Sequence, residues 1–419
     1  MTTSKPRSPF PAGGRHWDDL NAEMVRRSAR DADIQGGRAP AFYFFAEEET
    51  YEIGKKAFNA YFSQNALGNK VFPGLQSMET DVLDYGLGLF SAPEGGHGIF
   101  SSGGSESIFL ALKAAREAHR AQNKVGRETP LNIVVPITVH PAFDKAAIAM
   151  DLEVRRAALR PDRRVDPGAM RELIDENTMA LVGSAPCFPH GVIDPIEDLS
   201  RIAVELGKWL HVDACVGGWI APFFTRIGRS TPAFDFRFPG VRSISADLHK
   251  FGFCPKPAST VFFRNREDAE RSAFRVDAWP SGPFLTETLV GTRPGGAVSG
   301  AWAVLNHMGT PGFEGLARRL ANMVDGYVAG IRSIRGLEMW SEPDVTIINY
   351  GSHEVNMQGV AKLMMQKGFL PSLTRAPLGL HAMLAMQHEP VRAQYLDALR
   401  DSVETVRTSG SSGTVKSVY

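Results

Sequence analysis

The chain has 419 residues, 43% of them hydrophobic, with 46 basic and 46 acidic residues, so its formal net charge is zero. A soluble protein of this length is expected to have two domains, because a chain this long exceeds what a single hydrophobic core usually holds. The balanced charge excludes a net field that favours nucleic acid or an acidic membrane surface, and no run of ~18 apolar residues could form a transmembrane segment.

The first part of the chain predicts an arm followed by a large domain. Residues 1–55 form the predicted N-terminal arm, a helical pattern covers 51–62, and Gly68, Pro73 and Gly74 predict a turn. Within the large domain, residues 56–310, short runs rich in valine and isoleucine alternate with helical patterns. This alternation indicates βαβ units and a mainly parallel sheet with helices on both faces. The predicted strands are 131–138, 179–185, 209–213 and 242–246, and the predicted helices are 105–120, 167–176 and 196–206.

The last part of the chain predicts a smaller α+β domain over residues 311–407. A glycine cluster at 291–296 precedes it, and helical patterns resume at 302–307 and 315–334. The remaining predicted elements are a strand at 344–350, a helix at 355–367 and a strand at 379–386. Residues 408–419 predict a flexible tail because their first part is rich in serine and glycine. The chain is therefore expected to be an α/β protein.

Two runs carry residues that together indicate pyridoxal 5'-phosphate (PLP) chemistry. The run 243–250, Ser-Ile-Ser-Ala-Asp-Leu-His-Lys, ends in His249 and Lys250, and the run that begins at 211 places Asp213 at the end of a predicted strand. A lysine amine forms a Schiff base with the cofactor aldehyde, and an aspartate keeps the pyridine nitrogen protonated so that the ring accepts electrons. Each residue alone is ordinary, but together they predict an enzyme.

A glycine pair before a predicted helix supplies a candidate phosphate site. Gly103, Gly104 and Ser105 follow a short apolar run and lead into the helical pattern at 105–120. Glycines there let backbone N–H groups approach a phosphate, and the helix dipole favours its negative charge. A plain strand–helix turn is the alternative. Nucleotide-binding motifs are absent, and without H-E-x-x-H or clustered Cys/His spacing no metal site is expected.

Several separated blocks resemble the sphingosine-1-phosphate lyase branch of the group II PLP-dependent decarboxylases. The blocks are 72–74, 102–107, 140–147, 188–195, 211–215, 234–237, 243–250 and 291–296. The likeness runs from about Ala41 to beyond His381 and implies a fold-type I, PLP-dependent transferase-like architecture. It also implies a mainly parallel large domain with a smaller α+β C-terminal domain.

The resemblance also implies roles for individual residues. His140 would stack on the pyridine ring, Asp213 would pair with the pyridinium, and Lys250 would carry the cofactor. The other implied cofactor contacts are Gly103, Gly104, Ser105, Ser184, His211, His249 and Thr292. The loop 291–296 would reach the cofactor phosphate of a neighbouring subunit, so a homodimer with its active site at the subunit interface is expected. A plain Gly/Pro turn is the alternative for this loop.

Substrate residues depart from the family pattern. The family's phosphate-binding histidine falls on Gly68, and a tyrosine linked to substrate phosphate falls on Phe44, with Tyr43 adjacent. Lys256 is retained as a candidate substrate ligand. Losing two hydrogen bonds to a charged phosphate would cost roughly 3–6 kcal/mol, or ~10²–10⁴-fold in affinity. Arg375 is a candidate replacement that would bind a substrate carboxylate; a surface arginine is the alternative.

The expected function is therefore that of a PLP-dependent carbon–carbon lyase, with retro-aldol cleavage of a β-hydroxy amine to an aldehyde and an amine. An amino-acid decarboxylase that releases CO₂ is the alternative, and in either case a small-molecule amine or amino acid is the substrate. A catalytically inactive PLP-binding scaffold is disfavoured, because it would not need Lys250, Asp213 and His140 together. The three cysteines lack C-x-x-C spacing and suggest a reducing compartment, so a cytoplasmic location is expected.

Overall fold

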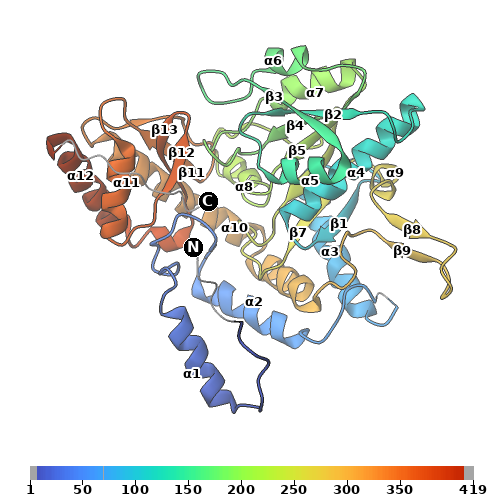
Figure 1. The fold of residues 1–419 in the computed structure, drawn as a ribbon, viewed down its shortest axis with the longest axis horizontal. Helices are drawn as coiled ribbons and strands as arrows, with labels where there is room; N and C mark the ends of the chain where they lie inside the picture. Colours follow the sequence, from blue (N-terminus) through green and yellow to red (C-terminus); the bar gives the residue numbers. More distant parts are fainter. Residues whose placement is uncertain (1–6, 69, 410–419) are drawn as a thin grey trace.

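The larger part of the protein is built around a mainly parallel sheet of seven strands (Figure 1). The computed structural model describes residues 7–68 and 70–409. The strands are β1 (His97–Ser101), β2 (Leu131–Pro136), β3 (Leu152–Ala157), β4 (Thr178–Ser184), β5 (Trp209–Asp213), β6 (Val241–Ala246) and β7 (Ser259–Phe263). Their order is β1-β7-β6-β5-β4-β2-β3, and β7 runs antiparallel to both of its neighbours. The predicted parallel architecture is confirmed, because β5 pairs in parallel with β4 and β6, and β2 with β3 and β4.

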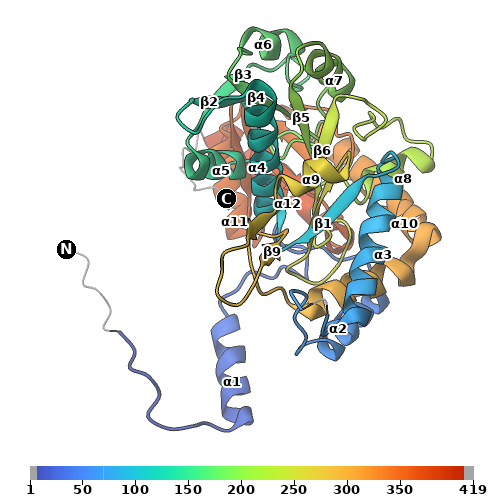
Figure 2. The ribbon, with the colours of Figure 1, turned by 90° about the vertical axis from the view of Figure 1, so that its right-hand side faces the viewer.

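Helices cover both faces of this sheet, which explains why its central strands are almost entirely buried (Figure 2). Successive side chains of a strand point to opposite faces, so Val134 and Val135 of β2 enter different buried clusters. On the face of Val135 lie α4 (Gly104–Asn123), α5 (Ala142–Met150) and α9 (Arg266–Glu270). On the other face lie α3 (Pro73–Leu89), α6 (Pro167–Glu172), α7 (Ile196–Glu205) and α8 (Ala221–Arg226).

A smaller antiparallel sheet lies beside the large one and carries the C-terminal helices (Figure 1). Its strands, in the order β10-β11-β13-β12, are β10 (Glu338–Met339), β11 (Ile347–Gly351), β12 (Ser372–Arg375) and β13 (Leu378–Met383). The helical elements are α11 (Met357–Gln366), a 3-10 turn at Met386–His388 and α12 (Arg392–Ser409). The predicted α+β C-terminal part is therefore present. The tail was predicted to begin at residue 408, whereas α12 continues through Ser409; residues 410–419 lie outside the described residues.

One long helix, α10 (Gly295–Arg332), connects the two sheets. The patterns at 302–307 and 315–334 both fall within it or just beyond its end. The helix bends at Gly309, whose backbone is not helical (φ 52°), and Pro311 two residues later has no N–H to donate. The domain boundary expected after residue 310 therefore falls inside α10, next to this bend.

The N-terminal segment and one hairpin extend from the body. None of the described side chains of α1 (Trp17–Ser28) is buried, and the helix projects away from both sheets (Figure 2). By contrast, α2 (Glu48–Ala60) packs along α10. The hairpin of β8 (Phe274–Val276) and β9 (Phe284–Thr286) projects at the right of Figure 1, at the far end of the molecule from the small sheet. Pro73 begins α3 instead of a turn, because proline is well tolerated in the first helical position. No helix within 7–68 and 70–409 is both long and apolar enough to cross a membrane.

Candidate active site

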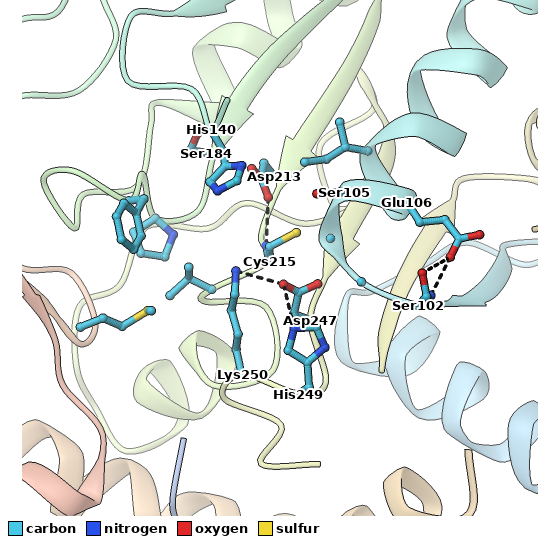
Figure 3. Close-up of a pocket in the computed structure, with 17 residues that line it drawn as sticks. Ser102, Ser105, Glu106, His140, Ser184, Asp213, Cys215, Asp247, His249 and Lys250 are labelled. Carbon is cyan, nitrogen blue, oxygen red and sulfur yellow. Dashed lines mark hydrogen bonds and ion pairs between the residues drawn. The ribbon is translucent and has the colours of Figure 1, made fainter. Parts of the chain in front are cut away.

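The residues predicted to bind the cofactor gather at one edge of the large sheet. Ser184 and Asp213 are the last residues of β4 and β5, while His140 follows β2 and Lys250 follows β6. These strands are parallel, so their carboxyl ends meet, and ligands of such sheets bind at that edge. All four side chains line one cavity of about 400 Å³ (Figure 3).

The turn between β1 and α4 provides the donor-rich end of this cavity. Gly104 is the first residue of α4, and the first N–H groups of a helix have no partner within it. A Cβ built on Gly104 would lie 2.7 Å from Cys215 Sγ and 3.0 Å from Asp247 Oδ1. Only glycine therefore lets the helix start pack this closely against the floor of the cavity. Gly103 and Ser105 line the cavity beside it.

Glu106 fastens this turn to a distant loop, a role that the sequence did not predict. Its side chain is buried, and Oε2 accepts hydrogen bonds from the N–H (2.7 Å) and hydroxyl (2.6 Å) of Ser102. Oε1 accepts from the N–H groups of Leu289 (2.8 Å) and Val290 (3.1 Å). One carboxylate thus satisfies four donors from two segments almost 200 residues apart, and the loop it holds leads into 291–296. A glutamate in the first helical turn also suits the positive end of the helix dipole.

Replacing Glu106 with alanine is expected to lower the free energy of unfolding by at least ~3 kcal/mol, because it leaves several buried donors unpaired. Urea unfolding at neutral pH measures this change. Glu117→Ala, on the exposed side of the same helix where Glu117 pairs with Arg116, is the matched control and should change stability by less than ~1 kcal/mol. Equal effects of the two variants would contradict the role given to Glu106.

Lys250 forms a buried ion pair with Asp247, three residues before it. The Lys250 Nζ lies 3.0 Å from Asp247 Oδ2, and Ser259 Oγ donates to Oδ1 at 2.5 Å. Burial favours the neutral form of each group, but their mutual attraction outweighs it. The pKa of Lys250 is therefore raised and the pKa of Asp247 is lowered. Asp247 was not among the predicted site residues, although it belongs to the same motif as Lys250.

Asp213 stands at the end of a directed chain of buried hydrogen bonds. Trp209 Nε1 donates to Ser243 Oγ (2.8 Å), which leaves the Ser243 hydroxyl free to donate to His211 Nδ1 (2.8 Å). The His211 proton then lies on Nε2, which is 3.3 Å from Ser245 Oγ, and Ser245 donates to Asp213 Oδ1 (3.2 Å). The N–H of Cys215 also donates to Oδ1 at 3.1 Å. Two donors therefore fix the orientation of the Asp213 carboxylate.

His211 was expected to contact the cofactor, but the structure places it behind Asp213. The ring is fully buried on β5 and does not line the cavity, because His211 lies two residues before Asp213, on the same face of the strand but deeper in the sheet. Burial lowers the pKa of His211 to about 4, against the opposing effect of Asp213, so the ring is neutral at pH 7.

A neutral buried histidine makes folding sensitive to acid. Because the folded pKa (about 4) is below the unfolded value of 6.5, the unfolded state alone binds this proton between those pH values. The contribution of the neutral His211 ring to the free energy of unfolding is fully present above pH 6.5. As the pH falls from there towards 4, we expect this contribution to decrease by about 1.4 kcal/mol per pH unit.

Urea unfolding at several pH values measures that slope. His211→Gln should show a shallower slope than the unmodified protein by about this amount. His353→Gln replaces an exposed histidine and should leave the slope unchanged. If the free energy of unfolding changes with pH by the same slope in all three proteins, the lowered pKa of His211 in the folded state would be contradicted.

Two further histidines face the cavity from opposite sides. His140 Nδ1 accepts a hydrogen bond from the N–H of Ala142 (3.1 Å), and burial lowers the pKa of its ring. His249 Nδ1 accepts from the N–H of Ala258 (3.2 Å), so the neutral ring carries its proton on Nε2. That atom lies 3.8 Å from Asp247 Oδ2, beside the start of α4. His249 can therefore donate a hydrogen bond to a group held there.

Three other predicted residues lie outside this cavity. Thr292 is on the exposed loop before α10, where its hydroxyl accepts a hydrogen bond from Asn65 Nδ2 (3.4 Å). Lys256 is exposed, and its Nζ donates to the carbonyl oxygen of Phe42 at 3.1 Å. Arg375 lines a second cavity instead.

The cavity fits pyridoxal phosphate. Its glycine-lined end presents free N–H groups at the start of a helix, which suits a phosphate. Asp213 provides an oriented carboxylate for a pyridinium nitrogen, and Lys250 is the one residue with a primary amine among the described residues that line the cavity. Fold and site together define an enzyme that uses this cofactor. No group of three or more metal-binding side chains was found within residues 7–68 and 70–409.

Comparisons with known proteins agree with this class. The model of the pyridoxal-dependent decarboxylase conserved domain matches residues 56–351. A sphingosine-1-phosphate lyase of rice is 33% identical over an alignment that covers 97% of this chain and 76% of that protein. A probable L-tyrosine/L-aspartate decarboxylase of Methanothermobacter thermautotrophicus is 32% identical, with 85% and 95% covered. The structure of a sphingosine-1-phosphate lyase of Burkholderia pseudomallei superimposes with a TM-score of 0.91 at 31% identity, covering 97% of this chain and 95% of that one.

The chain belongs to the pyridoxal-dependent decarboxylase family, within which it is similar to the sphingosine-1-phosphate lyases. It is a PLP-dependent lyase of fold type I.

Proposed function

We propose that the chain cleaves the Cα–Cβ bond of a β-hydroxy amine, giving an aldehyde and a shorter amine. The observation that carries the proposal is the meeting of Lys250, Asp213 and the glycine-lined helix start in one cavity. The likeness to lyases named for sphingosine 1-phosphate, which extends over nearly the whole chain, favours carbon–carbon cleavage over decarboxylation.

Each residue of the cavity has a proposed part in this reaction. Bound pyridoxal phosphate supplies an electron-accepting ring that stabilises a carbanion at Cα of the substrate. Gly103, Gly104 and His249 would bind its phosphate, and Asp213 would hold the proton on its ring nitrogen. His140, which lines the same cavity, would contact its ring. Lys250 Nζ is the covalent attachment point and the nearest group that can move a proton to or from Cα.

In the cleavage itself, the substrate's β-hydroxyl loses its proton and the O–H electrons form the aldehyde carbonyl. The Cα–Cβ electron pair stays on Cα, which then takes up a proton to give the amine. The reaction needs no oxidant or reductant. Substrate positioning by the residues of the cavity would decide between this outcome and loss of CO₂.

The substrate is proposed to differ from a phosphorylated sphingoid base. The Phe44 ring packs against the Phe251 ring with centroids 5.1 Å apart, and Phe253 lies edge-on to Phe251. These rings offer no hydroxyl to a phosphate. Lys256, the retained candidate ligand, has a backbone carbonyl as its neighbour, and Gly68 offers no side chain.

A homodimer is also proposed, with the active site at the subunit interface. The β8–β9 hairpin and the loop after it expose large apolar side chains, namely Phe274, Trp279, Leu285 and Leu289, each more than half exposed. They lead into 291–296, the loop that the family resemblance assigns to a neighbouring subunit's cofactor. A cytoplasmic location is proposed because Cys187, Cys215 and Cys254 are free and buried, as expected in a reducing compartment.

Product analysis tests the proposed reaction. Purified holoenzyme is given sphingosine 1-phosphate, phenylserine and threonine, and aldehyde and CO₂ are both measured. Aldehyde from at least one β-hydroxy amine, absent with Lys250→Ala, is the expected result. Release of CO₂ without aldehyde would replace carbon–carbon cleavage with decarboxylation.

A further inference from the structure

A second cavity, of about 390 Å³, adjoins the cofactor cavity, and Phe188 lines both. It lies where the large and small sheets meet. One wall comes from the segments that follow β2 and β4, and the other from the β12–β13 hairpin. Phe188 therefore forms part of the boundary between the two cavities.

The charge of this cavity is positive. Among its described lining residues there is no aspartate or glutamate, and Arg375 is the one permanently charged side chain. Arg375 ends β12 at the exposed mouth of the cavity, and no ion pair within residues 7–68 and 70–409 includes it. Its guanidinium is free to bind a planar anion through two parallel hydrogen bonds.

A buried polar atom in the same lining lacks a partner. His381 is 5% exposed, and its Nδ1 has no hydrogen-bond partner among the described residues. Its Nε2 lies 3.0 Å from Ser372 Oγ, and its ring stands edge-on to Phe188 with centroids 4.6 Å apart. When Ser372 donates to Nε2, Nδ1 carries the proton and is a free donor. Buried polar groups are nearly always paired, so this donor indicates a ligand or a water.

The neighbouring His190 offers an acceptor. Asn349 Nδ2 donates to Thr374 Oγ1 (3.2 Å) and to the carbonyl of Leu380 (3.1 Å), so Asn349 Oδ1 must accept from His190 Nδ1 (2.8 Å). The neutral His190 ring therefore has its lone pair on Nε2. The cavity lining thus combines a cation, a neutral donor and a neutral acceptor.

We propose that this second cavity is a substrate subsite that takes a carboxylate, bound by Arg375, on a substrate that also bears a hydroxyl. His381 Nδ1 donates to the carboxylate, and His190 Nε2 accepts from the hydroxyl. The inference rests on the proposed function, which supplies the β-hydroxy amine, and it adds the acidic group.

Calorimetric titration of the holoenzyme with glutarate and with propylphosphonate tests the subsite without turnover. Glutarate is expected to bind, and Arg375→Ala should raise its Kd by at least ~10-fold, as expected for loss of a bidentate charged contact. Arg375→Lys keeps the charge without the planar fork and should have an intermediate effect. Arg400→Ala removes an exposed arginine of α12 and should leave the Kd unchanged.

Three results would overturn the inference: no glutarate binding, an unchanged Kd in Arg375→Ala, or propylphosphonate binding more tightly than glutarate at Arg375. Aldehyde release by the same preparations separates the two proposals. If glutarate binding depends on Arg375 but no β-hydroxy amine gives aldehyde, the proposed reaction is contradicted and the proposed subsite is not. Aldehyde release, together with a glutarate Kd that is unchanged in Arg375→Ala, would contradict the proposed subsite but not the proposed reaction.

Discussion

Lys250→Ala is expected to lower kcat/KM for aldehyde formation by on the order of 10⁴-fold, because the variant loses both a covalent attachment point and a proton-transfer group. No other described residue that lines the cavity has a primary amine to replace it. The variant should also lose the absorbance of the lysine-bound cofactor. Stopped-flow measurement of aldehyde and the absorbance spectrum of the purified protein check both expectations.

The control must separate chemistry from stability, because removal of Lys250 leaves the buried Asp247 carboxylate without its cation. Lys250→Arg keeps a positive charge beside Asp247 but cannot form the covalent attachment, so it should fold well and remain inactive. Lys256→Ala, which removes an exposed lysine six residues later, should retain the cofactor spectrum. Substantial activity in Lys250→Arg would contradict the covalent role.

Asp213→Asn is expected to lower kcat by about 10²–10³-fold, the usual effect of removing one preorganised electrostatic contact. The amide oxygen can still accept from Cys215 N–H and from the Ser245 hydroxyl, so the side chain should stay in place. What is lost is the negative charge beside the ring nitrogen. Single-turnover kinetics measure the change, and cofactor titration shows whether affinity falls as well.

Ser245→Ala provides the graded comparison for this residue. It keeps the charge of Asp213 but removes one of the two donors that orient the carboxylate. We expect a loss of about 10-fold, smaller than that of Asp213→Asn, because a single hydrogen bond contributes roughly 1.4 kcal/mol. A greater loss in Ser245→Ala than in Asp213→Asn would show that orientation matters more than charge.

The sequence predicted the centre of the large sheet well and its margins poorly. Strands β2, β4, β5 and β6 are buried on both faces, and each gives a short, largely apolar run that includes valine or isoleucine. Strand β7 was not predicted, although it is equally buried. Helix α3 was missed because Pro73 and Gly74 resemble a turn when their packing partners are unknown.

The site was predicted where the chemistry of a residue type is specific. A lysine, an aspartate and a glycine pair suggest a cofactor when they occur together, and the structure brings all of them to one cavity. Asp247 and Glu106 could not be assigned, because a carboxylate within a motif has many uses until its partners are known. His211 was placed in the cavity because the sequence puts it two residues before Asp213 but does not show that it lies deeper in the sheet than the strand end.

The single carboxylate of Glu106 has a consequence for assembly. It bonds on one side to Ser102 at the candidate phosphate turn and on the other to the backbone of Leu289 and Val290, next to the apolar hairpin proposed as a subunit contact. Two equilibria that order the same atoms are thermodynamically linked, and the coupling is reciprocal. Saturation with pyridoxal phosphate should therefore lower the dimer dissociation constant by the same factor by which dimerisation raises cofactor affinity.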